Sequence, residues 1–70
     1  MNYFEAVGQN ILAVLHQTHM ERKELADKLG VSRQMLQKIL KGQKAINVME
    51  ISRIAGVLGV PVDVLLRDKQ

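Results

Sequence analysis

The sequence predicts an all-α fold, a compact bundle of five helices in a single domain over residues 1–70. Apolar residues recur every three or four positions along most of the chain, which is the spacing of one helix face. The chain is 47% hydrophobic with Tyr3 and Phe4 as its only aromatic residues, so the core is aliphatic and suits packed helices better than a sheet sandwich. Because there is no Cys, neither disulfides nor thiolate-bound metals support the fold.

The first helix is predicted to start at Asn2, which can cap it, with Glu5 completing a capping box three residues later. It runs to His16 or Gln17 and buries a stripe at helical spacing: Phe4, Val7, Ile11, Val14 and Leu15. Leu12 lies off that stripe, so this helix is apolar almost all round. The excess apolar surface indicates either wide burial or a partner chain.

The link over residues 17–20 contains neither Gly nor Pro. We expect His19 to end the first helix in the left-handed conformation, which His tolerates better than most residues. His16 and His19, with Glu21 close by, are also conceivable metal ligands. A structural zinc site needs four ligands, however, and the chain has only these two His. We therefore expect no metal and no cofactor.

Residues 22–41 hold two short helical patterns on either side of a glycine turn. The first pattern covers residues 22–29 and buries its apolar positions, Leu25, Ala26 and Leu29. Gly30 permits the positive backbone dihedral that turns the chain, and Ser32 caps the second pattern. Three residues between two helices, with Gly first, set the helices at a steep angle and predict a helix-turn-helix.

The second pattern has two chemically opposite sides when it is placed on a helix at ~100° per residue. One arc holds only cations and amides: Arg33, Gln34, Gln37, Lys38 and Lys41. The other arc holds only hydrocarbon: Met35, Leu36, Ile39 and Leu40. The apolar arc buries against the domain, and the polar arc offers the donors that base edges and phosphates accept in a major groove. This helix is therefore predicted to recognise DNA.

The net charge of +3 is unevenly distributed along the chain. Residues 22–44 hold seven cations and two carboxylates, a local net charge of +5 that leaves −2 for the remainder. Arg22, Lys23 and Arg33 stand at two helix starts, where the helix dipole disfavours cations unless an anion such as a phosphate lies between them. The alternative is that these are solvated surface charges. The asymmetry indicates a polyanion as partner.

Membrane, enzymatic and ligand-binding functions find little support in the sequence. The cations lie on two short elements rather than along one amphipathic membrane helix. No apolar run approaches the ~20 residues that span a bilayer, and the N-terminus lacks a secretory signal pattern. No Ser-His-Asp set or paired carboxylates are present, and no small-molecule ligand is evident. We expect a cytoplasmic protein that is not an enzyme.

Two further helices are predicted after a connection over residues 43–46. Asn47 caps the fourth helix, whose spacing predicts a buried stripe of Val48, Ile51, Ile54, Ala55 and Leu58. Gly56 inside that pattern costs roughly 1 kcal/mol relative to Ala, and close contact with another helix is one explanation. Gly59 ends the fourth helix, and Pro61 stands where the first residue of the fifth is expected. The fifth helix docks through its apolar residues, Val62, Leu65 and Leu66.

Small and apolar residues stand at fixed positions over nearly the whole chain: Leu25-Ala26, Gly30-Val31-Ser32, Leu36, Ile39, Gly42, Ile51, Ile54-Ala55, Leu58-Gly59-Val60 and Leu65-Leu66. In this register the chain resembles the lambda-repressor-like, Cro-type (Xre-type) helix-turn-helix domains. The resemblance implies a bundle of five helices, the third of which enters the major groove of DNA.

The resemblance also implies which residues contact DNA. Base contacts fall to Arg33, Gln34 and Lys38 on the third helix, with Gln37 as a lesser candidate. We expect phosphate contacts at the helix starts and in the loop after the third helix, from Arg22, Lys23, Ser32, Lys41, Gln43, Lys44 and Asn47.

The chain departs from the family pattern at three positions. Relatives often have Gln in place of Arg22. Many relatives also pair an Arg on the first helix with a Glu near the end of the third, where this chain looks to have Leu15 and Leu40. Replacing both partners of a buried ion pair with hydrocarbon can be neutral or stabilising, so we expect these two leucines to pack directly.

We therefore expect a sequence-specific double-stranded DNA-binding transcriptional regulator of prokaryotic or phage type, a repressor that occludes an operator. Because one such domain makes limited base contact, we expect a homodimer on a palindromic operator. Leu12, Val57 and Val64 are candidates for the dimer face, and the alternative is that they fill the core of their own chain. The rival function is a protein-interaction module on the same fold, such as an antitoxin or antirepressor.

Overall fold

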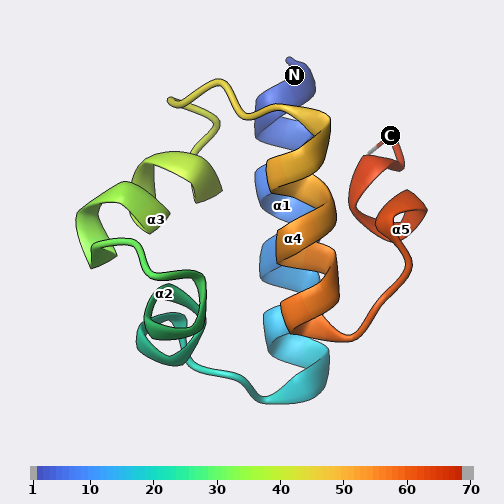
Figure 1. Ribbon diagram of the computed structural model, residues 1–70. Helices are drawn as coiled ribbons and strands as arrows, with labels where there is room; N and C mark the ends of the chain where they lie inside the picture. The colour runs from blue at the N-terminus through green and yellow to red at the C-terminus, as the bar shows by residue number, and fades with distance from the viewer. Residues whose placement is uncertain (1, 69–70) are drawn as a thin grey trace.

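The computed structural model describes residues 2–68, and within that range every regular element is an α-helix (Figure 1). The five helices of this range are α1 (Tyr3–Thr18), α2 (Arg22–Leu29), α3 (Arg33–Leu40), α4 (Val48–Leu58) and α5 (Val62–Leu66). The predicted all-α, five-helix bundle is confirmed. No helix of the described range is long and apolar enough to cross a bilayer.

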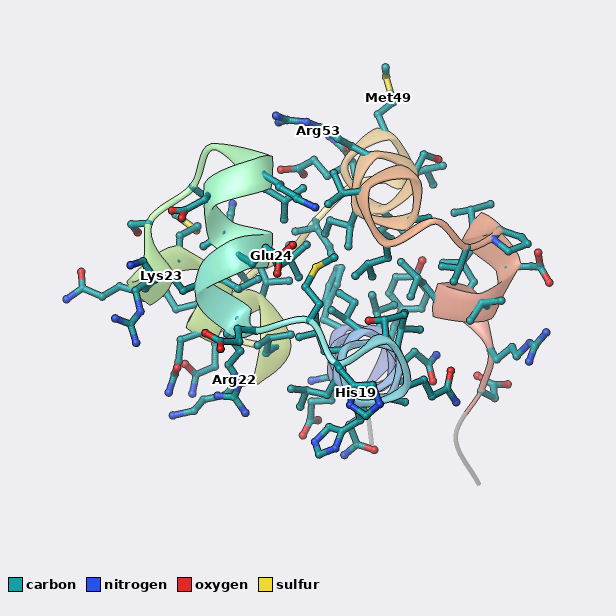
Figure 2. The ribbon with its side chains drawn as sticks, turned by 90° about the horizontal axis from the view of Figure 1, so that it is seen from below. His19, Arg22, Lys23, Glu24, Met49 and Arg53 are labelled. Carbon is teal, nitrogen blue, oxygen red and sulfur yellow. The ribbon has the colours of Figure 1, made fainter. Side chains whose placement is uncertain are left out.

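The helices surround a core that lies between α1 and α4. In Figure 1, α4 lies in front of α1, with α2 and α3 on one side of this pair and α5 on the other. Figure 2 shows α1 and α4 end-on, with side chains filling the space between them. α1 packs against α3 and α5, and α4 packs against α2 and α5. The helix-turn-helix is thus held on one side of the bundle, opposite α5.

The core is aliphatic and draws on every helix. Its buried members are Val7, Ile11, Val14, Leu15, Leu25, Ala26, Leu29, Leu36, Ile39, Leu40, Ile46, Ile51, Ile54, Ala55, Leu58 and Leu65. Leu15 and Leu40 are both buried members of this cluster, and their direct contact stays a prediction. Ile46 is only 6% exposed although it lies in the link before α4. Helical periodicity did not predict its burial, because a link has no helical period.

The predicted capping residues start their helices as expected. The Asn2 side-chain oxygen accepts a hydrogen bond from the Glu5 amide at 2.8 Å, and the Glu5 carboxylate accepts one from the Asn2 amide at 3.1 Å. Asn47 and Glu50 form the same reciprocal pair at the start of α4, at 2.8 and 2.9 Å. His19, with φ of 57°, ends α1 in the predicted left-handed conformation.

Several expectations at helix ends and on outer faces are wrong. α1 ends at Thr18, one residue past the approximate predicted end, whereas Pro61 is the residue before α5 and not its first, because its ψ of 148° is extended. Val48 is 63% exposed, since it stands roughly 70° from the centre of the buried arc of α4. Leu66 is 36% exposed, because the short α5 turns Leu65 inward instead.

The close helix contact that was one explanation for Gly56 is not found among residues 2–68. A Cβ built on Gly56 meets nothing within 4 Å. The close approach lies at Gly8 in α1, where a Cβ would stand 2.7 Å from the carbonyl carbon of Leu40. Gly42, with φ of +73°, likewise brings its backbone against Glu5, 2.6 Å from the place its Cβ would take. Two glycines therefore let the C-terminal end of α3 rest directly on α1.

Asn10 is the buried polar residue of the described range, at 5% exposure. Its side-chain nitrogen donates to the carbonyl oxygens of Leu65 at 3.0 Å and Arg67 at 2.8 Å. These carbonyl groups lie at the C-terminal end of α5, where no following helical N–H group is available to donate a hydrogen bond to them. Asn10 thus ties the last helix to α1, on the side of the bundle away from α3.

Candidate nucleic-acid interface

α3 has the two-faced character that its sequence predicts. Leu36, Ile39 and Leu40 are buried, and Met35 is partly buried against the same core. The four predicted base-contact residues are all exposed and together line one shallow hollow of about 380 Å³: Arg33, Gln34, Gln37 and Lys38. Two cations and two amides thus share one solvent-facing surface. Arg and Gln side chains are suited to paired hydrogen bonds with guanine and adenine edges.

The start of α3 is fixed by its cap. Ser32 is extended, and its hydroxyl oxygen accepts a hydrogen bond from the Met35 amide at 3.0 Å. The hydroxyl proton of Ser32 is then available for donation to a phosphate oxygen. Arg33 follows directly, so its side chain leaves from the first residue of the helix.

The structure brings the starts of α2 and α3 together around one concavity. Arg22 and Arg33 both line a hollow of about 110 Å³, with Leu36, Gln37 and Leu40 completing its wall. α2 has no side-chain cap, because Glu21 makes no capping hydrogen bond, so its first amide N–H groups lack the partner that a capping side chain supplies. Figure 2 shows Arg22 and Lys23 on the outer side of α2. This arrangement supports the expectation that a phosphate lies between the two helix starts.

The remaining predicted phosphate contacts follow α3 in sequence. Lys41 and Gln43 are exposed, and Lys44 is half-buried in the link to α4. Asn47 is exposed, and its side-chain oxygen is used by the Glu50 amide. The side-chain NH₂ of Asn47 is therefore the group that would donate a hydrogen bond to a phosphate.

Ion pairing within the chain leaves most of these cations available. In residues 2–68, Lys28 pairs with Glu24 at 3.1 Å, and Arg67 pairs with Asp63 at 3.8 Å. Neither pair involves a predicted DNA contact. The other cations of residues 22–44 have no carboxylate within ion-pair distance among the described residues.

The three candidate dimer-face residues are only partly exposed. Leu12, Val57 and Val64 each pack against the core cluster of their own chain. This packing favours the alternative in which they contribute to the core. Sequence reasoning overlooked a different exposed apolar residue, Met49 on α4, which is 81% exposed.

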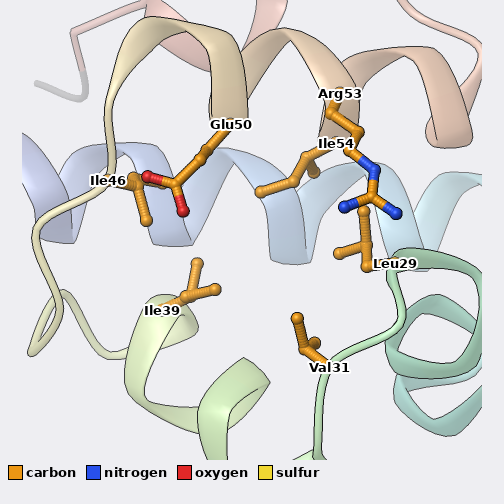
Figure 3. A pocket seen from close by; sticks show the side chains of 7 residues that line it. All are labelled: Leu29, Val31, Ile39, Ile46, Glu50, Arg53 and Ile54. Atoms are coloured by element: carbon orange, nitrogen blue, oxygen red, sulfur yellow. The ribbon is translucent and has the colours of Figure 1, made fainter.

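A small apolar pocket lies between α4 and the helix-turn-helix (Figure 3). Leu29, Val31, Ile39, Ile46 and Ile54 form its walls, and Glu50 and Arg53 stand at its rim. Its volume is about 60 Å³. Typical small-molecule pockets are several times larger, at roughly 300–1,000 Å³. This pocket is therefore smaller than the cavities that usually hold small molecules.

Comparison with known proteins identifies the family of the chain. Residues 16–65 match the helix-turn-helix family, and the chain belongs to that family, in its lambda-repressor-like (Xre) branch. The protein is a DNA-binding transcription regulator.

The fold is also that of a solved structure, the crystal structure of the DNA-binding domain of BldD. The two superpose with a TM-score of 0.82, over 96% of this chain and 100% of the other, at 22% sequence identity. No curated protein matches the chain.

Proposed function

We propose that this regulator binds one double-stranded DNA sequence and represses transcription by occluding its operator. The observation that carries the proposal is the outer face of α3, where Arg33, Gln34, Gln37 and Lys38 are exposed together while the opposite face is buried. The similar solved structure is itself a DNA-binding domain, which supports the same partner. The proposal takes residues 1–70 as one domain and assigns no enzymatic step to it.

The contacts divide into two kinds by chemistry. The four residues on the outer face of α3 read base edges, where a paired Arg–guanine or Gln–adenine contact is worth about 1–3 kcal/mol of discrimination. Residues around that face contact the phosphates: Arg22, Lys23, Ser32, Lys41, Gln43, Lys44 and Asn47. These contacts fix the position of α3 on the duplex without reading its sequence.

Repression follows from occupancy of the operator in this proposal. One helix-turn-helix reads only a few base pairs, so two copies on the half-sites of a palindrome supply the remaining specificity. Polymerase is then excluded by the bound protein. Occlusion needs no second ligand.

The test is selection of bound duplexes from a random-sequence pool. The expected result is one enriched consensus with two inverted half-sites about one helical turn apart. Equal recovery of all sequences would contradict sequence-specific binding. An enriched but asymmetric single site would retain the DNA-reading role and remove the palindrome.

The variant Arg33→Ala/Lys38→Ala distinguishes sequence-specific DNA binding from the rival function, a protein-interaction module. If α3 reads bases, this variant loses the preference for the selected duplex over random duplex. The matched control is Arg67→Ala/Lys28→Ala, which removes the same charge from sites outside the interface. An unchanged preference in the α3 variant would remove the recognition role of this helix.

A further inference from the structure

The outer face of α4 has features that neither the core nor the proposed DNA interface uses. Met49 is 81% exposed, and Figure 2 shows it projecting away from the bundle. Gly56 stands seven residues later, roughly 10 Å along the same outward arc. An exposed Gly inside a helix weakens it relative to Ala, and no contact within residues 2–68 accounts for this one. The face therefore has a projecting side chain and, two turns away, a position without a side chain.

We propose that this face docks on α4 of a second copy of the chain, antiparallel and about a two-fold axis, with Met49 of each copy seated over Gly56 of the other. A two-fold interface must be self-complementary, because each patch meets itself reversed. In an antiparallel pair centred between Ser52 and Arg53, the projecting Met49 of each copy faces the side-chain-free Gly56 of the other, so the same contact forms twice. Ser52 is exposed and small, so it allows the two helix backbones to approach near the axis.

The charges on α4 are complementary under the same symmetry. Glu50 and Arg53 leave α4 on one edge, the edge that faces the helix-turn-helix (Figure 3). The two-fold axis of an antiparallel helix pair is perpendicular to the plane of the two helices, so this edge faces the same way in both copies. Arg53 of each copy then lies beside Glu50 of the other. Among residues 2–68, Arg53 makes no ion pair within its own chain.

This symmetry also orients the DNA-binding surfaces. Because the helix-turn-helix lies beyond that same edge of α4, both α3 helices fall on one side of the pair. α3 packs against α1, whereas α2 packs against α4, so α3 is set back from the docking face. The domain is 22 and 21 Å across in its shorter directions, and twice that width accommodates the ~34–36 Å between half-sites. This orientation rests on the proposed function, whereas docking itself does not.

The size of the contact sets its strength. α4 has 11 residues, and one pair of such helices covers less than the roughly 1,200 Å² at which stable interfaces begin. Free protein therefore self-associates weakly. Two copies on neighbouring half-sites are held at high effective concentration, so the same contact then makes DNA binding cooperative.

The decisive variant is Gly56→Gln. The added side chain fills the position that receives Met49 but meets nothing within residues 2–68 of its own chain, and Gln favours a helix more than Gly does. We expect a higher melting temperature together with self-association weakened by at least about tenfold, measured by sedimentation equilibrium. Misfolding would instead lower the melting temperature. Met49→Gln should also weaken association, and the control Leu66→Gln, an exposed apolar residue on α5, should not.

Cross-linking gives an independent readout because the chain has no Cys. Ser52→Cys places a thiol next to the axis in both copies, so mild oxidation should yield a covalent dimer. Gln9→Cys, on the exposed side of α1, is the control and should stay monomeric. Equal cross-linking of both variants would contradict docking through α4.

Three results would overturn the proposal. The first is wild-type protein that stays monomeric at ~1 mM, both alone and on a palindromic duplex. The second is a dimer that Gly56→Gln leaves unchanged. The third is occupation of this face by a different protein while the chain remains monomeric. A monomer that still selects one sequence overturns only the docking, and a dimer that binds all duplexes equally overturns only the sequence-specific function.

Discussion

α3 and α4 are built alike on their inner faces and differently on their outer faces. Each begins with a side-chain cap, Ser32 or Asn47, and each buries three or four aliphatic residues in the common core. The outer face of α3 has cations and amides, whereas α4 exposes Met49, Ser52 and Gly56 with the opposite charges of Glu50 and Arg53 along one edge. One packing rule therefore positions both helices, and the outward residues alone decide whether a helix suits a polyanion or an apolar partner.

The two helices also differ in how they are held. The end of α3 rests on α1 through the bare backbones of Gly8 and Gly42, while α4 has no such glycine contact at Gly56. The proposed role of α3 would benefit from this, because side chains that read bases must be held to within about 0.5 Å. The variants below test two expectations. Changes on the buried faces should alter the stability of the fold, and changes on the exposed face of α3 should alter DNA binding.

The largest expected effect is loss of the inner face of α3. Leu36 is almost fully buried, so Leu36→Ala should lower the free energy of unfolding by about 2–5 kcal/mol, measured by chemical denaturation. The control is Gln37→Ala at the exposed neighbouring residue, which should change the free energy of unfolding by less than about 0.5 kcal/mol. Equal effects of the two variants would mean that α3 is not docked as described.

The two helical glycines should respond to Ala with opposite signs. In Gly8→Ala the new methyl meets the backbone of α3, so overpacking should destabilise the fold by about 1–3 kcal/mol. In Gly56→Ala the methyl meets open space, so the better helix propensity should stabilise the fold by up to about 1 kcal/mol. Thermal denaturation of both variants provides the comparison. Stabilisation by Gly8→Ala would contradict the close contact between α1 and α3.

Removal of one base-reading side chain should affect specificity. Arg33→Ala should cost about 1–3 kcal/mol in binding the selected operator and relax the preference at one base position. Competition binding with single-base operator variants measures both quantities. Arg67→Ala removes the same charge on the far side of the bundle and should change neither. Uniform weakening toward every sequence would reassign Arg33 to a phosphate.

The smallest expected effect is at a phosphate contact. Lys44→Ala should weaken binding to all duplexes alike and reduce the slope of log affinity against log salt by about 1. Titrations at several salt concentrations, with operator and random duplex, measure this slope. An unchanged slope would show that the half-buried Lys44 does not reach the DNA.

The elements with strong local signals could be predicted from the sequence. The bounds of α2, the caps Asn2, Ser32 and Asn47, and the left-handed end at His19 all match the structure. Each depends on hydrogen bonds or backbone preferences within four residues of itself, and these are readable in a single chain. The division of α3 into polar and apolar sides follows from its period in the same way.

Only the tertiary structure decided which surfaces meet. The burial of Ile46, the exposure of Val48 and the role of Asn10 depend on residues distant in sequence. The sequence left a close helix contact as one explanation for Gly56, whereas the fold places such a contact at Gly8. Local preferences determine that a helix forms and which side is apolar. Its neighbours determine where backbones touch, because that depends on how separate helices dock.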